Sequence, residues 1–97
     1  MAIPQHTIDQ ILDRTDIVDL IGQRVKLKKT GRTYSGCCPF HQEKTPSFHV
    51  YRDKQYYHCF GCQANGNAIR FLMDIDNRNF IDVMKELSTN TGVELPK

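Results

Sequence analysis

Two short pairs of cysteine and histidine constrain this chain more than any other feature of its sequence. The motifs Cys38-Pro-Phe-His41 and Cys59-Phe-Gly-Cys62 each place two residues between two candidate metal ligands, and seventeen residues (positions 42 to 58) separate the pairs. Two intervening residues let one tight turn aim both side chains at a single ion, and this pattern is typical of structural zinc sites. The sequence therefore predicts one zinc ion, held by Cys38, His41, Cys59 and Cys62.

Four protein ligands would complete a tetrahedron around the zinc and leave no open position for water. The predicted role of the metal is therefore structural, and no catalytic residue is predicted. Structural zinc contributes about 10 to 16 kcal/mol in small peptides near neutral pH, so its removal should unfold much of the domain. A redox role for the Cys59–Cys62 pair would require a thioredoxin-like strand and helix pattern before it, and none is present.

Other cysteine and histidine residues offer alternative ligands. Cys37 could replace Cys38, but the spacing to His41 would then be three residues and the proline would no longer follow the ligand directly. We therefore favour Cys38 and expect Cys37 to be a spare thiol. His49 and His58 are possible substitutes for His41, although isolated histidines on strands are usually packed or solvated.

Length and composition indicate one small folded domain that fills residues 1–97. Leu, Ile, Val and Phe make up 24 of the 97 residues, which is above the level expected of a disordered chain. The apolar stretches are too short for a membrane span, and the first residues lack the features of a signal peptide. We therefore expect no membrane association. Without secretion, the four cysteines are expected to stay reduced, which favours metal binding over disulfides.

The net charge of +2 hides two segments of opposite sign. Residues 24–54 contain eight Lys or Arg and two acidic residues, a charge of +6, while the rest contains five basic and nine acidic residues, a charge of −4. Such asymmetry suggests a face for a polyanion, and a solvated basic hairpin without a partner is the alternative.

Apolar periodicity predicts helices toward both ends of the chain. Helical patterns run through residues 68–73 and 80–87, and shorter ones lie before residue 22. These apolar stripes are assigned to the core. The residues expected to begin or end the helices are Thr7 with Gln10 as a capping box, Asp16, Gly22, Asn79 and Gly92.

The middle of the chain predicts a small antiparallel sheet. Apolar and charged residues alternate from 24 to 28, the pattern of a strand with one basic face. A turn at Thr30-Gly31 should lead to a returning strand at 32–37. Two further strands are expected at 48–51 and 55–59, with a turn at 52–54.

An ordered set of motifs resembles the N-terminal zinc-binding domain of bacterial replicative DNA primases over nearly the whole chain. Gln63 stands where that family usually has glycine. The resemblance implies an α+β zinc ribbon, in which a small antiparallel sheet carries a structural zinc at one end and helices flank it. The motifs lie at Thr15–Ile21, Val25–Lys29, Cys37–Phe48, Tyr57–Cys62 and Gly66–Met73.

The resemblance also implies a function within a larger enzyme. Members of this family make RNA primers on single-stranded DNA at the bacterial replication fork, in the cytoplasm and nucleoid. Their polymerase domain holds Mg2+ and their C-terminal domain binds the replicative helicase, and neither domain is expected in these residues. This chain is therefore expected to bind the template, to help select initiation sites and to assist a polymerase domain in cis or in trans. It is not expected to be catalytic alone.

The predicted strands supply the chemistry that single-stranded DNA requires. Aromatic rings can stack on exposed bases, and Lys or Arg can contact phosphates. Phe48 is expected in the core, whereas Tyr34 is left open. The alternative is a zinc ribbon that only docks the polymerase domain or helicase. The DNA contacts expected from these residues and from the family are Lys28, Arg32, Lys44, Pro46, Lys54 and Tyr56.

Overall fold

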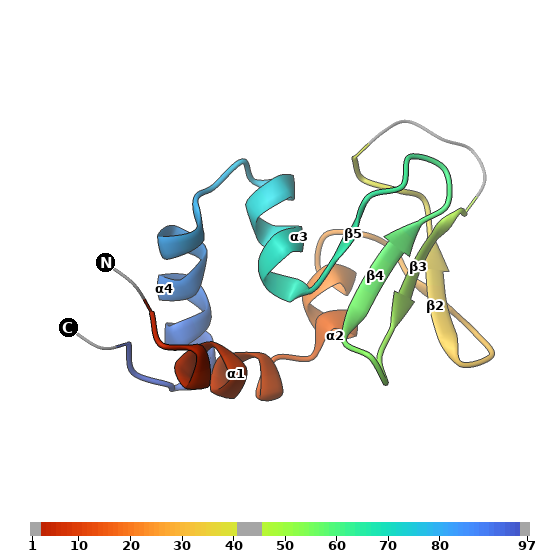
Figure 1. Ribbon diagram of the computed structural model, residues 1–97. Helices are drawn as coiled ribbons and strands as arrows, with labels where there is room; N and C mark the ends of the chain where they lie inside the picture. Colours follow the sequence, from red (N-terminus) through yellow and green to blue (C-terminus); the bar gives the residue numbers. More distant parts are fainter. Residues whose placement is uncertain (1–2, 41–45, 96–97) are drawn as a thin grey trace.

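Two helices precede a group of short strands along the chain, and two further helices follow it (Figure 1). The computed structural model describes residues 3–40 and 46–95. No helix in those ranges has the length and apolar character that a membrane crossing requires. The elements are α1 (Gln5–Asp13), α2 (Ile17–Gly22), β1 (Lys28–Thr30), β2 (Thr33–Gly36), β3 (Phe48–Tyr51), β4 (Tyr56–Cys59), β5 (Asn65–Gly66), α3 (Ala68–Ile75) and α4 (Phe80–Thr91).

The five strands form one antiparallel sheet in the order of the chain, from β1 to β5. Helix α2 contacts β3, α3 contacts β5, and α4 contacts α1 and α3. Figure 1 shows α1, α3 and α4 on one side of the molecule and the sheet on the other, with α2 between them. This arrangement confirms the predicted α+β class.

The two faces of the sheet have different environments. Successive side chains of a strand point to opposite faces, and residues paired across antiparallel strands share a face. On β3 and β4, one face is buried beneath the helices and the other is only half-buried. We call the second one the outer face. The buried set is Phe48, Val50, Tyr57 and Cys59, and the outer set is His49, Tyr51, Tyr56 and His58.

Four aromatic rings form the part of the core between the sheet and α3. Phe48 and Tyr57 lie with ring centroids 5.4 Å apart, and Phe71 lies 5.7 Å from Tyr57. Phe40 completes the cluster, 5.8 Å from Phe71. The burial of Phe48 confirms its expected place in the core.

Helix α1 does not begin as predicted. It starts at Gln5, its N-cap is Pro4, and no side chain caps it. Thr7 lies inside the helix and is buried, with its backbone N–H donating to the carbonyl of Pro4. The capping box of Thr7 and Gln10 was wrong because Pro4, with φ fixed at −59°, already begins the helix.

Three of the other predicted caps are confirmed, whereas Gly22 is the last residue of α2 and Gln23 is its C-cap. Asp16 accepts from the backbone N–H of Val18, and Asn79 accepts from that of Asp82. Gly92 follows α4 with φ of 77°, a left-handed conformation that glycine adopts without a Cβ clash.

The predicted strand over residues 24–28 was largely wrong. The N–H groups of Arg24 and Val25 donate to the carbonyl of Ile21, so this segment leaves α2 as a turn. It then passes so close to Gly36 that a Cβ there would lie 2.6 Å from the carbonyl oxygen of Lys26. Regular pairing begins only at Lys28, and β1 is exposed throughout.

The remaining strands agree with the prediction apart from their ends. β3 has the predicted bounds, while β2 and β4 are shorter than predicted. β2 begins later than predicted because Gly31 and Arg32 form a two-residue turn before it. β4 also begins later than predicted, because Gln55, with φ of 51°, lies in the turn before it. The short strand β5 was not predicted.

Candidate metal centre

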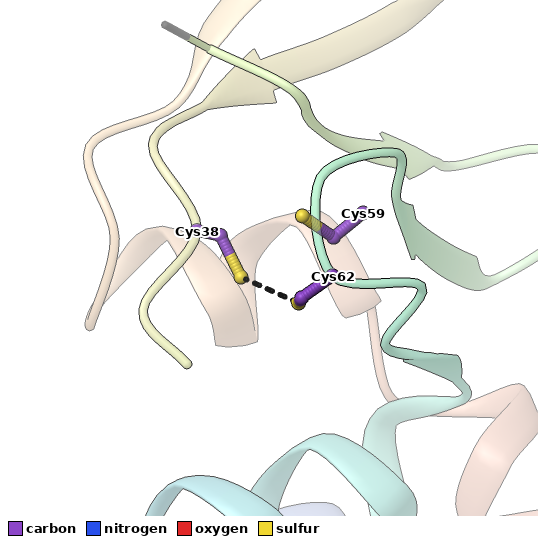
Figure 2. A group of neighbouring side chains, drawn as sticks. All are labelled: Cys38, Cys59 and Cys62. Carbon is purple, nitrogen blue, oxygen red and sulfur yellow. Dashed lines mark hydrogen bonds between the residues drawn. The ribbon is translucent and has the colours of Figure 1, made fainter. Parts of the chain in front are cut away.

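Three of the four predicted metal ligands lie together at one end of the sheet. Cys38 follows β2, Cys59 ends β4, and Cys62 lies in the turn between β4 and β5. Their sulfur atoms all lie within 4.8 Å of one another, and those of Cys38 and Cys62 are 3.6 Å apart (Figure 2). The fold therefore brings residues from distant parts of the sequence to one point.

The spacing of these sulfur atoms fits a zinc ion. With Zn–S bonds of about 2.3 Å, two corners of a tetrahedron lie about 3.8 Å apart. The separation of 3.6 Å is close to that value and far longer than a disulfide bond, and none of the three cysteines is in a disulfide. Three corners of a thiolate-rich tetrahedron are thus already in place.

Backbone N–H groups support the sulfur atoms. The N–H of Phe40 donates to the sulfur of Cys38 at 3.4 Å. The N–H groups of Gly61 and Cys62 donate to the sulfur of Cys59, which is the result expected of a tight turn with two residues between ligands. Such donors stabilise thiolates, the form of cysteine that binds metal.

The pKa values of Cys38 and Cys59 shift in opposite directions. Burial raises the pKa of Cys38 to about 12, although the N–H of Phe40 acts to lower it. Burial would also raise the pKa of Cys59, but hydrogen bonds from the N–H groups of Cys62 and Gly61 and from the side chains of Cys38 and Ser47 together lower it. Cys59 therefore ionises before Cys38, and a bound cation would favour the ionised form of Cys38.

The alternative ligands do not join this cluster. Cys37 is exposed, whereas Cys38 is buried. His49 and His58 are paired on the outer face of the sheet, away from the buried side chain of Cys59. Within residues 3–40 and 46–95, the three cysteines are the sole group of metal-binding side chains close enough to share an ion. His41 lies outside the described residues.

Comparison with known proteins agrees with this geometry. Residues 3–97 match the family model described as CHC2 zinc finger. The chain belongs to this family.

Relatives of this CHC2 zinc finger are DNA primases. The chain is 59% identical over 95 residues to the DNA primase of Haemophilus influenzae, and 56% identical over 94 residues to that of Escherichia coli K12. These matches cover 98% and 97% of the chain but 16% of each relative. The chain thus spans about a sixth of the length of these curated relatives.

A solved structure has the same fold. The crystal structure of the zinc-binding and RNA polymerase domains of the Aquifex aeolicus primase matches with a TM-score of 0.88 and 36% identity, over 99% of this chain and 23% of that one. This match confirms the zinc-ribbon architecture. It also confirms the resemblance to the zinc-binding domain of bacterial replicative primases.

The described residues among those predicted to contact DNA lie at four places of the CHC2 zinc finger. Lys28 lies on the outer face of the sheet, because the cross-strand pairing runs from Lys28 to His58. Tyr56 lies on the same face, because it precedes His58 by two residues on β4. Arg32 occupies the β1–β2 turn, and Lys54 occupies the β3–β4 turn, with its nitrogen 5.9 Å from the ring centroid of Tyr51. Pro46 is exposed beside the metal site, and Lys44 lies outside the described residues.

Two cations of the basic segment are held by carboxylates. Arg24 forms a bidentate ion pair with Asp76, at 2.7 and 2.9 Å. Arg52 pairs with Asp16 at 3.0 Å, and its guanidinium also lies over the ring of Tyr34. In the part of the chain that the structure describes, no carboxylate pairs with the remaining lysines of the segment or with its other arginine, at position 32.

The role of Tyr34, which the sequence left open, is structural. Its hydroxyl accepts a hydrogen bond of 3.0 Å from Arg52, and its register with Val50 puts it on the side of the helices. Tyr34 therefore does not lie on the outer face.

Phe60 is an exposed residue that the sequence reasoning did not select. It lies in the turn between Cys59 and Cys62, and 59% of its surface is exposed. Its position inside a tight turn between two ligands is the signal that could have identified it, because such a turn leaves little room to bury a large ring.

Proposed function

We propose that this CHC2 zinc finger is the template-binding domain of a DNA primase and binds single-stranded DNA with the outer face of its sheet. The observation that carries the proposal is the composition of this face. It joins half-buried aromatic rings with cations that no described carboxylate neutralises, whereas the opposite face is covered by helices.

The zinc ion would be held by Cys38, His41, Cys59 and Cys62. Bound there, it supplies a cross-link between the β2–β3 connection and the β4–β5 turn. Because four protein ligands fill the tetrahedron, the site would offer no position for a reacting water. We infer that primer synthesis and its Mg2+ belong to a separate polymerase domain, and that this chain is not catalytic alone.

The outer face has the parts that single strands require. Base stacking on an aromatic ring contributes about 1 to 3 kcal/mol per base, and Lys or Arg neutralise phosphates. Tyr56 is positioned for stacking because its hydroxyl donates to Asn65 at 2.9 Å, which fixes the ring on this face. The proposed phosphate contacts are Lys28, Arg32, Lys44 and Lys54, and Pro46 is proposed as a further DNA contact.

The DNA template and the polymerase domain follow from the names of the relatives and of the solved structure, and the helicase follows from the resemblance to bacterial replicative primases. We infer a DNA template and a polymerase domain, in cis or in trans, and a replicative helicase bound through a separate domain. Selection of initiation sites would occur on the outer face, at the bacterial replication fork in the cytoplasm.

A titration of the zinc-loaded chain with short single-stranded DNA at several salt concentrations tests this proposal. If four cations each neutralise one phosphate, the slope of log K against log salt should be about −0.7 × 4, or about −3. Lys28→Ala and Lys54→Ala should each weaken binding and reduce this slope by about 0.7. Lys85→Ala is the matched control, because Lys85 is exposed on α4, among the helices.

Two outcomes would contradict the proposal. A slope near zero would exclude the electrostatic contacts. An equal loss in all three variants would show that the outer face is not the binding surface. If Lys28→Ala and Lys54→Ala impair only the docking of a polymerase domain, the zinc ribbon is a docking platform and not a template reader.

A further inference from the structure

An exposed phenylalanine lies directly over two histidines on the outer face. The ring of Phe60 is 4.6 Å from that of His58 and 5.3 Å from that of His49, measured between centroids. The two histidines are directly opposite each other on β3 and β4. Phe60 is also the one large apolar side chain that the described residues leave exposed.

The two imidazoles have unused hydrogen-bonding capacity. Within residues 3–40 and 46–95, neither His49 nor His58 makes a hydrogen bond to the protein through its ring nitrogens. Each imidazole has one nitrogen that can donate and another that can accept in its neutral form. Both remain partly exposed, so a ligand can reach them.

The backbone that carries the ring of Phe60 is held by hydrogen bonds. The N–H of Phe60 donates to the carbonyl of Ser47 at 2.9 Å, and its own carbonyl accepts from the side chain of Gln63 at 3.3 Å. The turn is closed by the N–H of Gln63, which donates to the carbonyl of Cys59 at 2.8 Å. The turn that carries the ring is therefore ordered before a ligand binds, which favours binding.

We propose that Phe60, His49 and His58 form a site for one unpaired nucleobase of single-stranded DNA. The base stacks on the exposed side of Phe60, and the imidazole nitrogens face its hydrogen-bonding edge. The inference rests on the proposed template-binding function and adds a stacking residue that lies between two candidate zinc ligands.

The surroundings of the cluster favour a nucleic acid over a peptide. A row of paired residues crosses the outer face from β1 to β5 and contains a lysine but no acidic side chain. Since neighbouring strands lie about 4.8 Å apart, Lys28 is about 14 Å from His58, three strands away. A strand of DNA that crosses the sheet can thus place a base on Phe60 and a phosphate near Lys28. The row consists of Lys28, Ser35, His49, His58 and Asn65.

The absence of tryptophan from the sequence provides a direct test. Phe60→Trp places a single tryptophan at the proposed site, and stacking of a base should quench its emission. We would titrate this zinc-loaded variant with a short single-stranded oligonucleotide, and with one of equal length and charge that carries abasic positions. The normal oligonucleotide should quench the emission, and the fully abasic one should bind more weakly and leave the emission unquenched.

Binding affinities of further variants complete the test. Phe60→Leu keeps an apolar side chain but removes the π face, and should weaken binding about 5- to 150-fold. Phe60→Tyr should retain most of the affinity. Phe80→Leu, the same change on α4, should have no effect on DNA affinity. Zinc content and the thermal unfolding midpoint of each variant show whether it is folded.

The outcomes separate this inference from the function on which it rests. If folded Phe60→Leu binds as tightly as the unaltered chain while Lys28→Ala binds more weakly, the nucleobase site is overturned and the proposed function stands. Equal quenching by the normal and abasic oligonucleotides would also overturn the site. If the unaltered chain binds no single-stranded DNA, both proposals fail.

Discussion

The side-chain oxygen of Gln55 accepts a hydrogen bond of 2.8 Å from the backbone N–H of Ile17, the first residue of α2. The amide nitrogen of the same side chain donates to the carbonyl of Arg52 at 2.7 Å. Gln55 has φ of 51°, so an unusual backbone conformation directs this side chain toward the helix. The β3–β4 turn is thereby tied to the N-terminus of α2, 38 positions away along the chain.

Removal of this amide should loosen the contact between the turn and the helix. Gln55→Ala leaves the N–H of Ile17 without its partner, and we expect a loss of about 1 to 2 kcal/mol in the free energy of unfolding. Urea denaturation of the zinc-loaded protein measures it. Gln63→Ala is the control, because Gln63 also has a positive φ but its side chain donates to the carbonyl of Phe60 within a turn. Equal losses in the two variants would refute the capping role.

The two adjacent cysteines should differ sharply when replaced. Cys38→Ser should abolish stoichiometric zinc binding and cost more than about 4 kcal/mol of stability, because one corner of the metal site is lost. Cys37→Ser should retain one zinc ion per chain and nearly full stability, since Cys37 is exposed and outside the sulfur cluster. Atomic absorption and thermal denaturation measure these quantities. Loss of zinc from Cys37→Ser alone would reverse the assignment.

The hydroxyl of Tyr57 is buried and has no hydrogen-bond partner among residues 3–40 and 46–95. Tyr57→Phe removes this unsatisfied group while the ring stays in the aromatic cluster, so the free energy of unfolding should be unchanged or higher by up to about 1 kcal/mol. Tyr34→Phe is the matched change, and it should cost about 0.5 to 1.5 kcal/mol because it removes the bond from Arg52. A clear loss of stability in Tyr57→Phe would show that a partner, such as a bound water, satisfies the hydroxyl.

The ion pair of Arg24 and Asp76 predicts a particular pH dependence. The hydrogen bonds and charge of Arg24 lower the pKa of Asp76. A carboxyl whose pKa is lowered by folding stabilises the protein above its unfolded pKa of about 4, and this contribution is lost as the pH falls through the folded value. Asp76→Asn should therefore reduce stability equally at pH 7 and pH 5. Urea denaturation at both values measures the gap, and a gap that has already closed at pH 5 would contradict the lowered pKa.

Local sequence signals predicted much of this fold because their causes are local. Asp16 and Asn79 cap helices through N–H groups two and three residues away, and Gly92 adopts its left-handed conformation through its own backbone. The alternation in β3 also holds, since one face of that strand is buried. The same alternation failed at residues 24–27, where Gly36 allows a close crossing in place of strand pairing. Periodicity indicates which side chains are buried, but not what buries them.

The sequence by itself determined the spacing of the two Cys/His pairs, the helix caps at Asp16, Asn79 and Gly92, and the concentration of cations in residues 24–54, because each depends on residue type and short spacing. Only the tertiary structure decided which face of the sheet the helices cover, and thus that Tyr34 lies inside and Tyr56 outside. It also decided which cations are neutralised, as in the pairing of Arg24 with Asp76, and that Phe60 lies over two histidines. These relationships join residues far apart in the chain, and their free energies depend on distances that exist only after the core has formed.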